Sequence, residues 1–128
     1  MNDVEKFLWA ISGITFLQIM TGFYLSQISN AISSIILIFH IITGILLLIM
    51  AVASITVVSH ISRLKHLAMV NTILIVITLI TGTGFILFRY SNFYDQYMPY
   101  VQMALSIGII SNYAVMLGIK RTLDLNQS

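Results

Sequence analysis

Four apolar blocks, joined by short polar connections, divide the chain. The blocks cover about 7–25, 34–58, 67–88 and 101–119, and the connections are 26–33, 59–66 and 89–100. Each block is long enough to cross, or nearly cross, a hydrocarbon core of ~30 Å as a helix rising about 1.5 Å per residue. Short connections favour antiparallel neighbours. The pattern therefore predicts an all-α fold, an integral membrane four-helix bundle in a single transmembrane domain.

The composition excludes an ordinary water-soluble protein. Hydrophobic residues make up 59% of the chain and charged residues 8%, and the mean hydropathy is +0.99. A soluble domain carries about 25% charged residues, and a disordered chain combines low hydrophobicity with high net charge. The absence of cysteine excludes disulfides and cysteine-ligated clusters.

The basic residues predict the orientation. The N-terminus, the second connection and the C-terminus hold five of them: Lys6, Arg63, Lys65, Lys120 and Arg121. The other two connections hold only Arg89. Under the positive-inside rule both termini are cytoplasmic, and we expect the plasma membrane of a prokaryote. Basic residues placed beside apolar segments indicate a lipid bilayer, not nucleic acid, as the partner.

Aromatic residues crowd the third connection. They are Tyr90, Phe93, Tyr94, Tyr97 and Tyr100. Tyrosine suits the membrane interface because its ring is apolar and its hydroxyl polar. The segment is typical of an interfacial aromatic belt, and a lid or docking surface for a partner is the alternative.

His40 is the one ionisable group that falls clearly inside a predicted span, on the order of 10 Å below the outer surface. It opens a stripe with helical spacing, which continues through Gly44, Leu47, Ala51 and Ser54. A small and polar stripe is expected to face the bundle. Ionisable groups inside a bilayer are functional candidates. His40 is therefore either a cofactor ligand or a side chain hydrogen-bonded to a neighbouring helix.

Threonine–glycine pairs recur in three of the blocks, at Thr21-Gly22, Thr43-Gly44 and Thr81-Gly82. The predicted topology places all three in the outer half of the bundle, near the depth of His40. Glycines there either permit close helix packing or leave room for a flat ligand such as a porphyrin or a quinone. The similar strings around Thr21 and Thr81 suggest a duplicated two-helix unit.

A haem b in such a cavity would take His40 as its axial ligand to iron, with Gly44 and Gly82 making room for the ring. No second histidine is embedded, so Met20 or Met103 is the available partner for His–Met ligation. The alternative for both methionines is core filler. His60 and His66 are expected to lie in a solvated connection.

Other embedded polar residues indicate helix pairing and not catalysis. Gln18, Asn71 and Asn112 are expected to form hydrogen bonds between helices. The four acidic residues, Asp3, Glu5, Asp95 and Asp124, all fall outside the predicted spans. Because proton-coupled carriers commonly use embedded carboxylates, a small transporter ranks third among the functional hypotheses.

The string FHIITGILLLI at 39–49 resembles the histidine-bearing helix of small b-type membrane cytochromes and of haem A synthase. In those families a histidine early in a span is followed by a glycine one turn later and then by leucines. The segment 66–87 is similar to a following helix of such a bundle. The resemblance implies a haem-binding helical bundle with His40 as an axial ligand, and it departs from those families by offering Gln102 and Met103 where a second ligand is usual.

Two main hypotheses follow. The first is a small accessory subunit of a larger membrane complex, respiratory or otherwise redox-active, which is not an enzyme on its own and has other membrane subunits as partners. The second is a one-haem b-type cytochrome, or a haem- or quinone-interacting membrane protein, that uses His40.

Overall fold

The computed structural model describes residues 2–28, 33–88 and 91–127. They form four helices: α1 (Asp3–Gln27), α2 (Ile35–Val57), α3 (Ser62–Leu87) and α4 (Asn92–Gln127). No strand occurs in these residues. All four helices are long and apolar enough to cross a membrane. The all-α prediction is confirmed, and the chain has the structure of a multi-pass membrane protein.

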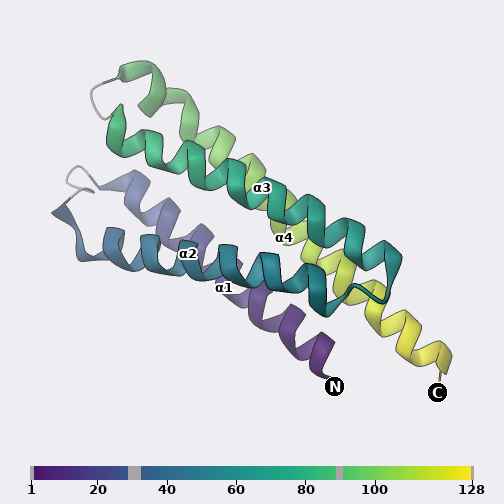
Figure 1. Ribbon diagram of the computed structural model, residues 1–128. Coiled ribbons are helices and arrows are strands. Elements are labelled where there is room, and N and C mark those ends of the chain that lie inside the picture. The colour runs from purple at the N-terminus through teal and green to yellow at the C-terminus, as the bar shows by residue number, and fades with distance from the viewer. Residues whose placement is uncertain (1, 29–32, 89–90, 128) are drawn as a thin grey trace.

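The helices form an antiparallel bundle in which each one packs mainly against two others (Figure 1). Helix α1 contacts α2 and α4, and α3 contacts the same two helices. Both termini lie at one end of the bundle, here called the termini end, together with the connection between α2 and α3. The last turns of α1 and α3 and the first turns of α2 and α4 lie at the opposite end, here called the hairpin end.

Capping explains where the first two helices begin. The Asn2 side chain accepts a hydrogen bond from the Glu5 backbone N–H at 2.9 Å, and acidic residues in the first turn suit the positive end of the helix dipole. Ser34 likewise accepts from the Ile36 backbone N–H at 3.2 Å. Helix α3 begins at Ser62 without a side-chain cap.

The expected connection at 89–100 is wrong for most of its length, because α4 already begins at Asn92. Hydropathy indicates which residues can face lipid, whereas the length of a helix depends on whether its backbone hydrogen bonds continue. Ser91 supports the early start by accepting from the Tyr94 backbone N–H at 3.3 Å. Pro99 lies inside the helix, where it has no N–H to donate to the Asp95 carbonyl one turn earlier. Arg89 and Tyr90, used in the predictions above, lie outside the described residues.

The expected connection at 59–66 is also too long, since α3 begins at Ser62. The Lys65 backbone N–H already donates to the Ile61 carbonyl at 2.9 Å. The polar residues that follow the second apolar block therefore belong to the first turn of α3.

The core is concentrated toward the termini end. Leu8 and Ile11 of α1 are completely buried there, and so are Ala68 of α3 and Tyr113 of α4. The predicted inward stripe of α2 is confirmed, because Gly44, Leu47, Ala51 and Ser54 are all buried. At the hairpin end, Gly84 is the only described residue of α3 beyond Ile75 that is buried. The bundle is thus closely packed at one end and more open at the other.

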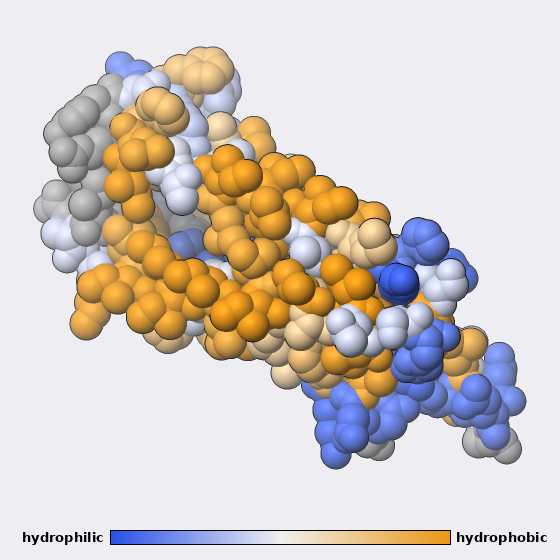
Figure 2. Space-filling view, in the orientation of Figure 1, coloured by the Kyte–Doolittle hydropathy of each residue, from blue (hydrophilic) through white to orange (hydrophobic). Residues whose placement is uncertain are grey.

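Polar contacts close the packed end. Asn71 donates to the Ile109 carbonyl at 3.2 Å and accepts from Asn112 at 2.9 Å, which joins α3 to α4 as expected. Glu5, which is almost fully buried, pairs with Arg121 at 3.2 Å and joins α1 to α4. Figure 2 shows hydrophilic residues gathered at this end beyond a broad apolar surface.

Candidate functional site

His40 lies near the hairpin end and is anchored to α1. Its Nδ1 is 2.6 Å from the Thr21 hydroxyl oxygen. That hydroxyl also lies 2.9 Å from the Leu17 carbonyl, which can accept its single proton. In the tautomer that carries the proton on Nδ1, His40 donates to the Thr21 oxygen while Thr21 donates to Leu17. In that tautomer the neutral imidazole holds its lone pair on Nε2.

Nε2 of His40 has no hydrogen-bond partner among the described residues. The side chain is partly exposed, so this nitrogen is not sealed inside the protein. Histidine in this state is a proton acceptor or a metal ligand, and the bond made by the other nitrogen fixes its orientation. His40 is therefore both hydrogen-bonded to a neighbouring helix and chemically available.

Two glycines allow α1 and α2 to approach at this level. A Cβ on Gly22 would lie 3.2 Å from Cε1 of His40. A Cβ on Gly44 would lie 2.7 Å from Nε2 of Gln18. Gln18 in turn accepts a hydrogen bond from the Thr43 hydroxyl. The glycines of these two Thr-Gly pairs therefore leave room for polar side chains of the neighbouring helix, His40 beside Gly22 and Gln18 beside Gly44.

The second hairpin has a matching polar pair. Gln102 of α4 donates to the Thr81 hydroxyl of α3 and to the Thr78 carbonyl, the latter at 3.1 Å. Thr81 repeats the arrangement of Thr21, since its hydroxyl lies 2.9 Å from the carbonyl one turn earlier, that of Ile77. Gln102 uses its amide nitrogen within the protein, whereas Nε2 of His40 has no hydrogen-bond partner among the described residues.

The two hairpins correspond position by position, which supports the suggested duplication. Thr21 and Thr81 are sixty residues apart, and buried Ile11 and Thr15 match buried Asn71 and Ile75 at the same spacing. On the second helix of each hairpin the spacing is sixty-two residues, and it relates His40 to Gln102. The same spacing relates three pairs of buried residues: Leu47 with Ile109, Ala51 with Tyr113, and Ser54 with Met116. Gln102 is thus the structural counterpart of His40. The Thr-Gly repeat alone does not reveal this relation, because Thr21 and Thr81 are sixty residues apart and His40 and Gln102 are sixty-two apart.

Tyr94 has a structural role that the sequence pattern did not indicate. Its hydroxyl donates to the Thr81 carbonyl, and its ring lies at 5.0 Å centroid distance from Phe85 in an edge-to-face contact. Gly84 provides the space, because a Cβ there would overlap the Tyr94 ring. Phe93, Tyr97 and Tyr100 are exposed on the same turns, in agreement with an aromatic belt.

The other predicted site residues lie apart from the contact between Thr21 and His40. Met20 and Met103 are 51% and 46% exposed, so neither fills the core. Each stands one position from an inward polar residue, Met20 before Thr21 and Met103 after Gln102. A Cβ on Gly82 would meet no atom within 4 Å, which leaves open space on that side of α3.

The remaining histidines stand at the termini end. His60 and His66 are exposed, and Nδ1 of His66 lies 2.9 Å from the Ser62 carbonyl. The described residues contain no group of three or more histidine, aspartate or glutamate side chains that could hold a metal ion. Any metal bound through His40 would need ligands from elsewhere.

The fold and the site together define a four-helix membrane protein built from two similar hairpins, one with an available imidazole and one with a satisfied amide. Comparison with protein-family models, with curated proteins and with solved structures finds no match to this chain.

Proposed function

We propose that this chain is a small subunit of a redox-active membrane complex and that it binds a haem b near the hairpin end through His40. The observation that supports this function is the state of the imidazole. Nδ1 lies 2.6 Å from the Thr21 hydroxyl, and Nε2 has no hydrogen-bond partner among the described residues. With the proton on Nδ1, which the Leu17 carbonyl allows by accepting from Thr21, the lone pair of Nε2 is available to a ligand. An axial histidine of a haem protein needs that arrangement.

The surroundings of His40 are compatible with a flat ligand. The side chains of the hairpin end leave much apolar surface uncovered, as at Phe23, Phe39 and Ile80, which are 53%, 48% and 66% exposed. Figure 2 shows hydrophilic atoms at the bottom of a hollow between α2 and α3 in this part of the molecule. A bound haem would supply one-electron transfer, and His40 would hold and orient it. With both termini in the cytoplasm, the site would lie in the outer half of the bilayer.

Absorption spectroscopy tests this function. The protein is expressed with haem supplied, purified in mild detergent, and measured oxidised and after reduction with dithionite. We expect a Soret band and a reduced α-band in the wild type and their loss in His40→Ala. The matched control is His66→Ala, because His66 is an exposed histidine at the opposite end. A wild-type protein without a Soret band, or equal loss in both variants, would refute haem binding at His40.

An accessory subunit without its own cofactor is the second candidate, and a groove between α1 and α4 favours it. The groove has a volume of about 380 Å³ and is lined mainly by apolar side chains, with Gly13 and Ala114 among them and Trp9 and Phe16 beside them. A Cβ on Gly13 would meet nothing within 4 Å. Small residues let transmembrane helices approach closely, so this surface suits a helix of a partner subunit.

Native electrophoresis of mildly solubilised membranes tests the second candidate. We expect the wild-type chain to migrate with subunits of a larger complex and Ala114→Leu to release it. Ala53→Leu is the matched control, since Ala53 is exposed on α2 away from the groove. Release by both variants, or a wild-type chain that migrates alone, would contradict docking at this groove.

A further inference from the structure

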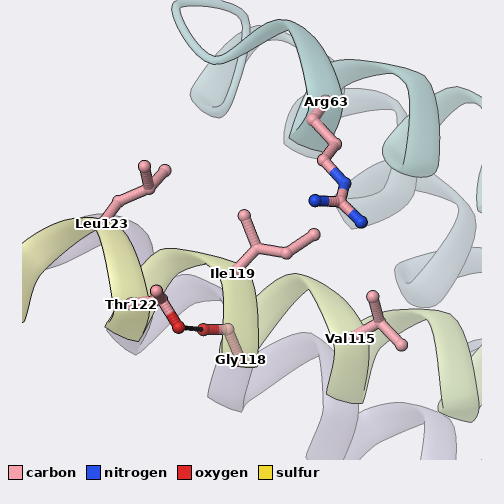
Figure 3. Close-up of a pocket in the computed structure, with 6 residues that line it drawn as sticks. All are labelled: Arg63, Val115, Gly118, Ile119, Thr122 and Leu123. Atoms are coloured by element: carbon pink, nitrogen blue, oxygen red, sulfur yellow. Dashed lines mark hydrogen bonds between the residues drawn. The ribbon is translucent and has the colours of Figure 1, made fainter.

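A second groove, at the termini end, combines an unpaired cation with apolar walls. It has a volume of about 320 Å³ and lies between the first turn of α3 and the last turns of α4. Its lining comprises Arg63, Val115, Gly118, Ile119, Thr122 and Leu123. Figure 3 shows the Arg63 side chain extending from α3 toward α4, above Ile119 and Val115.

The cations of the termini end are not equally available. Lys6 lies 4.0 Å from Asp3, Lys120 lies 2.5 Å from Asp124, and Arg121 lies 3.2 Å from Glu5. These contacts use every acidic side chain at this end.

By contrast, no carboxylate of the described residues lies within 4.0 Å of Arg63 or Lys65. Arg63 is exposed and stands in the first turn of α3, which has no side-chain cap. The positive end of a helix favours an anion. The excess positive charge of the termini end is therefore concentrated beside this groove.

The groove changes character along α4. From Val115 to Leu123 it spans nine residues, about 12 Å of helix. Toward Val115 the walls are aliphatic, and the Thr122 hydroxyl is already bonded to the Gly118 carbonyl at 2.9 Å. The charged residues Arg121 and Asp124 follow at the other end. The Arg63 guanidinium lies above Ile119 and Val115 (Figure 3), so an anionic head group bound to Arg63 would have aliphatic side chains directly beside it for its acyl chain.

We propose that this groove binds one anionic phospholipid, with the phosphate on the Arg63 guanidinium and an acyl chain along Val115 and Ile119. A guanidinium presents a planar fork of donors that matches phosphate oxygens. Basic residues at the surface of a membrane attract anionic lipids, and basic pockets between helices bind their head groups. The inference is independent of His40 and of haem.

Native mass spectrometry of the delipidated protein tests the proposal. The protein is titrated with phosphatidylglycerol and, separately, with phosphatidylcholine of the same chains. We expect one phosphatidylglycerol molecule to be retained in preference to phosphatidylcholine. Arg63→Gln should lower the retained fraction about tenfold, the loss expected when a charge-assisted hydrogen bond to the phosphate is removed.

Two further variants separate a built groove from general attraction. Lys65→Gln removes the same charge from the same turn without touching the groove and should retain the lipid. Gly118→Leu should block the groove while keeping every charge, and a Cβ at Gly118 meets nothing within 4 Å. If Gly118→Leu fails to elute as a monodisperse protein, Thr122→Leu takes its place, because Thr122 is exposed and lines the same groove.

The outcomes are decisive in both directions. Loss of phosphatidylglycerol in Arg63→Gln and in the groove-filling variant, with retention in Lys65→Gln, supports the proposal. Equal loss in Arg63→Gln and Lys65→Gln overturns it in favour of unspecific charge attraction, and so does retention in the groove-filling variant. Displacement of the lipid by millimolar inorganic phosphate would show that the acyl chain contributes nothing to binding. That result would also overturn the proposal.

Discussion

The two hairpins share one architecture and differ in what they do with a polar residue at the same place. In the first hairpin Thr21 holds His40 by one ring nitrogen and leaves the other without a partner among the described residues. In the second hairpin Thr81 and Thr78 both accept from Gln102, and Tyr94 adds a further bond to the Thr81 carbonyl. The first site is open for a ligand, whereas the second is closed by internal bonds.

This difference shows how one scaffold separates stability from chemistry. Polar groups inside a membrane are costly unless they are paired. The second hairpin satisfies Gln102 and Thr81 internally, and these bonds contribute to holding α3 and α4 together. The first hairpin leaves Nε2 of His40 without a partner among the described residues, and a ligand for His40 would satisfy it.

The largest effect on stability is expected at Gly84. A methyl group there would overlap the Tyr94 ring, which lies between Phe85 and Phe88 at centroid distances of 5.0 and 5.7 Å. Gly84→Ala should lower the free energy of unfolding by about 1–3 kcal/mol. Unfolding by SDS in mixed micelles, followed by circular dichroism, measures it. Gly82→Ala is the matched control, and a similar loss there would contradict the steric explanation.

The next effect concerns ligand affinity and separates the two threonines. Thr21→Val removes the acceptor for Nδ1 of His40, and loss of such a supporting bond lowers metal affinity about 10–100-fold. Thr81→Val removes the equivalent group beside Gln102 and should leave haem affinity unchanged. Haem titration of the apoprotein, read at the Soret band, measures both. Equal weakening by the two substitutions would remove the distinction between the hairpins.

A smaller effect on stability is expected at Asn71, a polar residue whose counterpart on α1 is the apolar Ile11. Asn71→Leu removes one bond to the Ile109 carbonyl and one from Asn112. We expect a loss of about 1–2 kcal/mol in the free energy of unfolding, the range for hydrogen bonds between membrane helices. Asn112→Leu should cost less, and the double variant should cost less than the sum because the two residues share a bond. Additive losses would indicate that they act independently.

The smallest effect is expected at His40 in the haem-free protein. His40→Leu removes one bond, which is worth about 0.6 kcal/mol on average between membrane helices. Gln102→Leu removes two bonds and should destabilise the protein more. The same SDS unfolding experiment compares them. A larger loss for His40→Leu would mean that His40 is a structural residue and Gln102 is not.

The helices and their inward faces could be predicted from the sequence because both depend on local patterns. Lipid exposure requires long apolar runs, and the stripe from Gly44 to Ser54 follows helical spacing. Hydrogen bonding of Asn71 and Asn112 between helices followed from the cost of isolated polar groups in a bilayer, although the sequence did not indicate that the two bond to each other. The orientation of the bundle in the membrane stays a prediction.

Other features depended on information that hydropathy does not contain. Helix α4 begins at Asn92 because Ser91 and the backbone support it, although the segment is too polar for a span. Gln102 was considered only as a missing ligand, whereas the structure makes it a hydrogen-bond donor to α3. The grooves beside α4 arise from side chains distant in sequence, such as Arg63 and Gly118, and no spacing rule brings them together.

The contact between the first and last helices has a consequence for chain order. Asn2 donates to Asp124 at 3.1 Å, and Glu5 pairs with Arg121, so the two ends of the chain meet. The connection between α2 and α3 lies at this same end (Figure 1). A circular permutant joined there by a short linker and opened at 58–61 would run α3, α4, α1, α2 with the same neighbours. We therefore expect the order of the two hairpins along the chain to be interchangeable, with the bundle determined by which helices are neighbours.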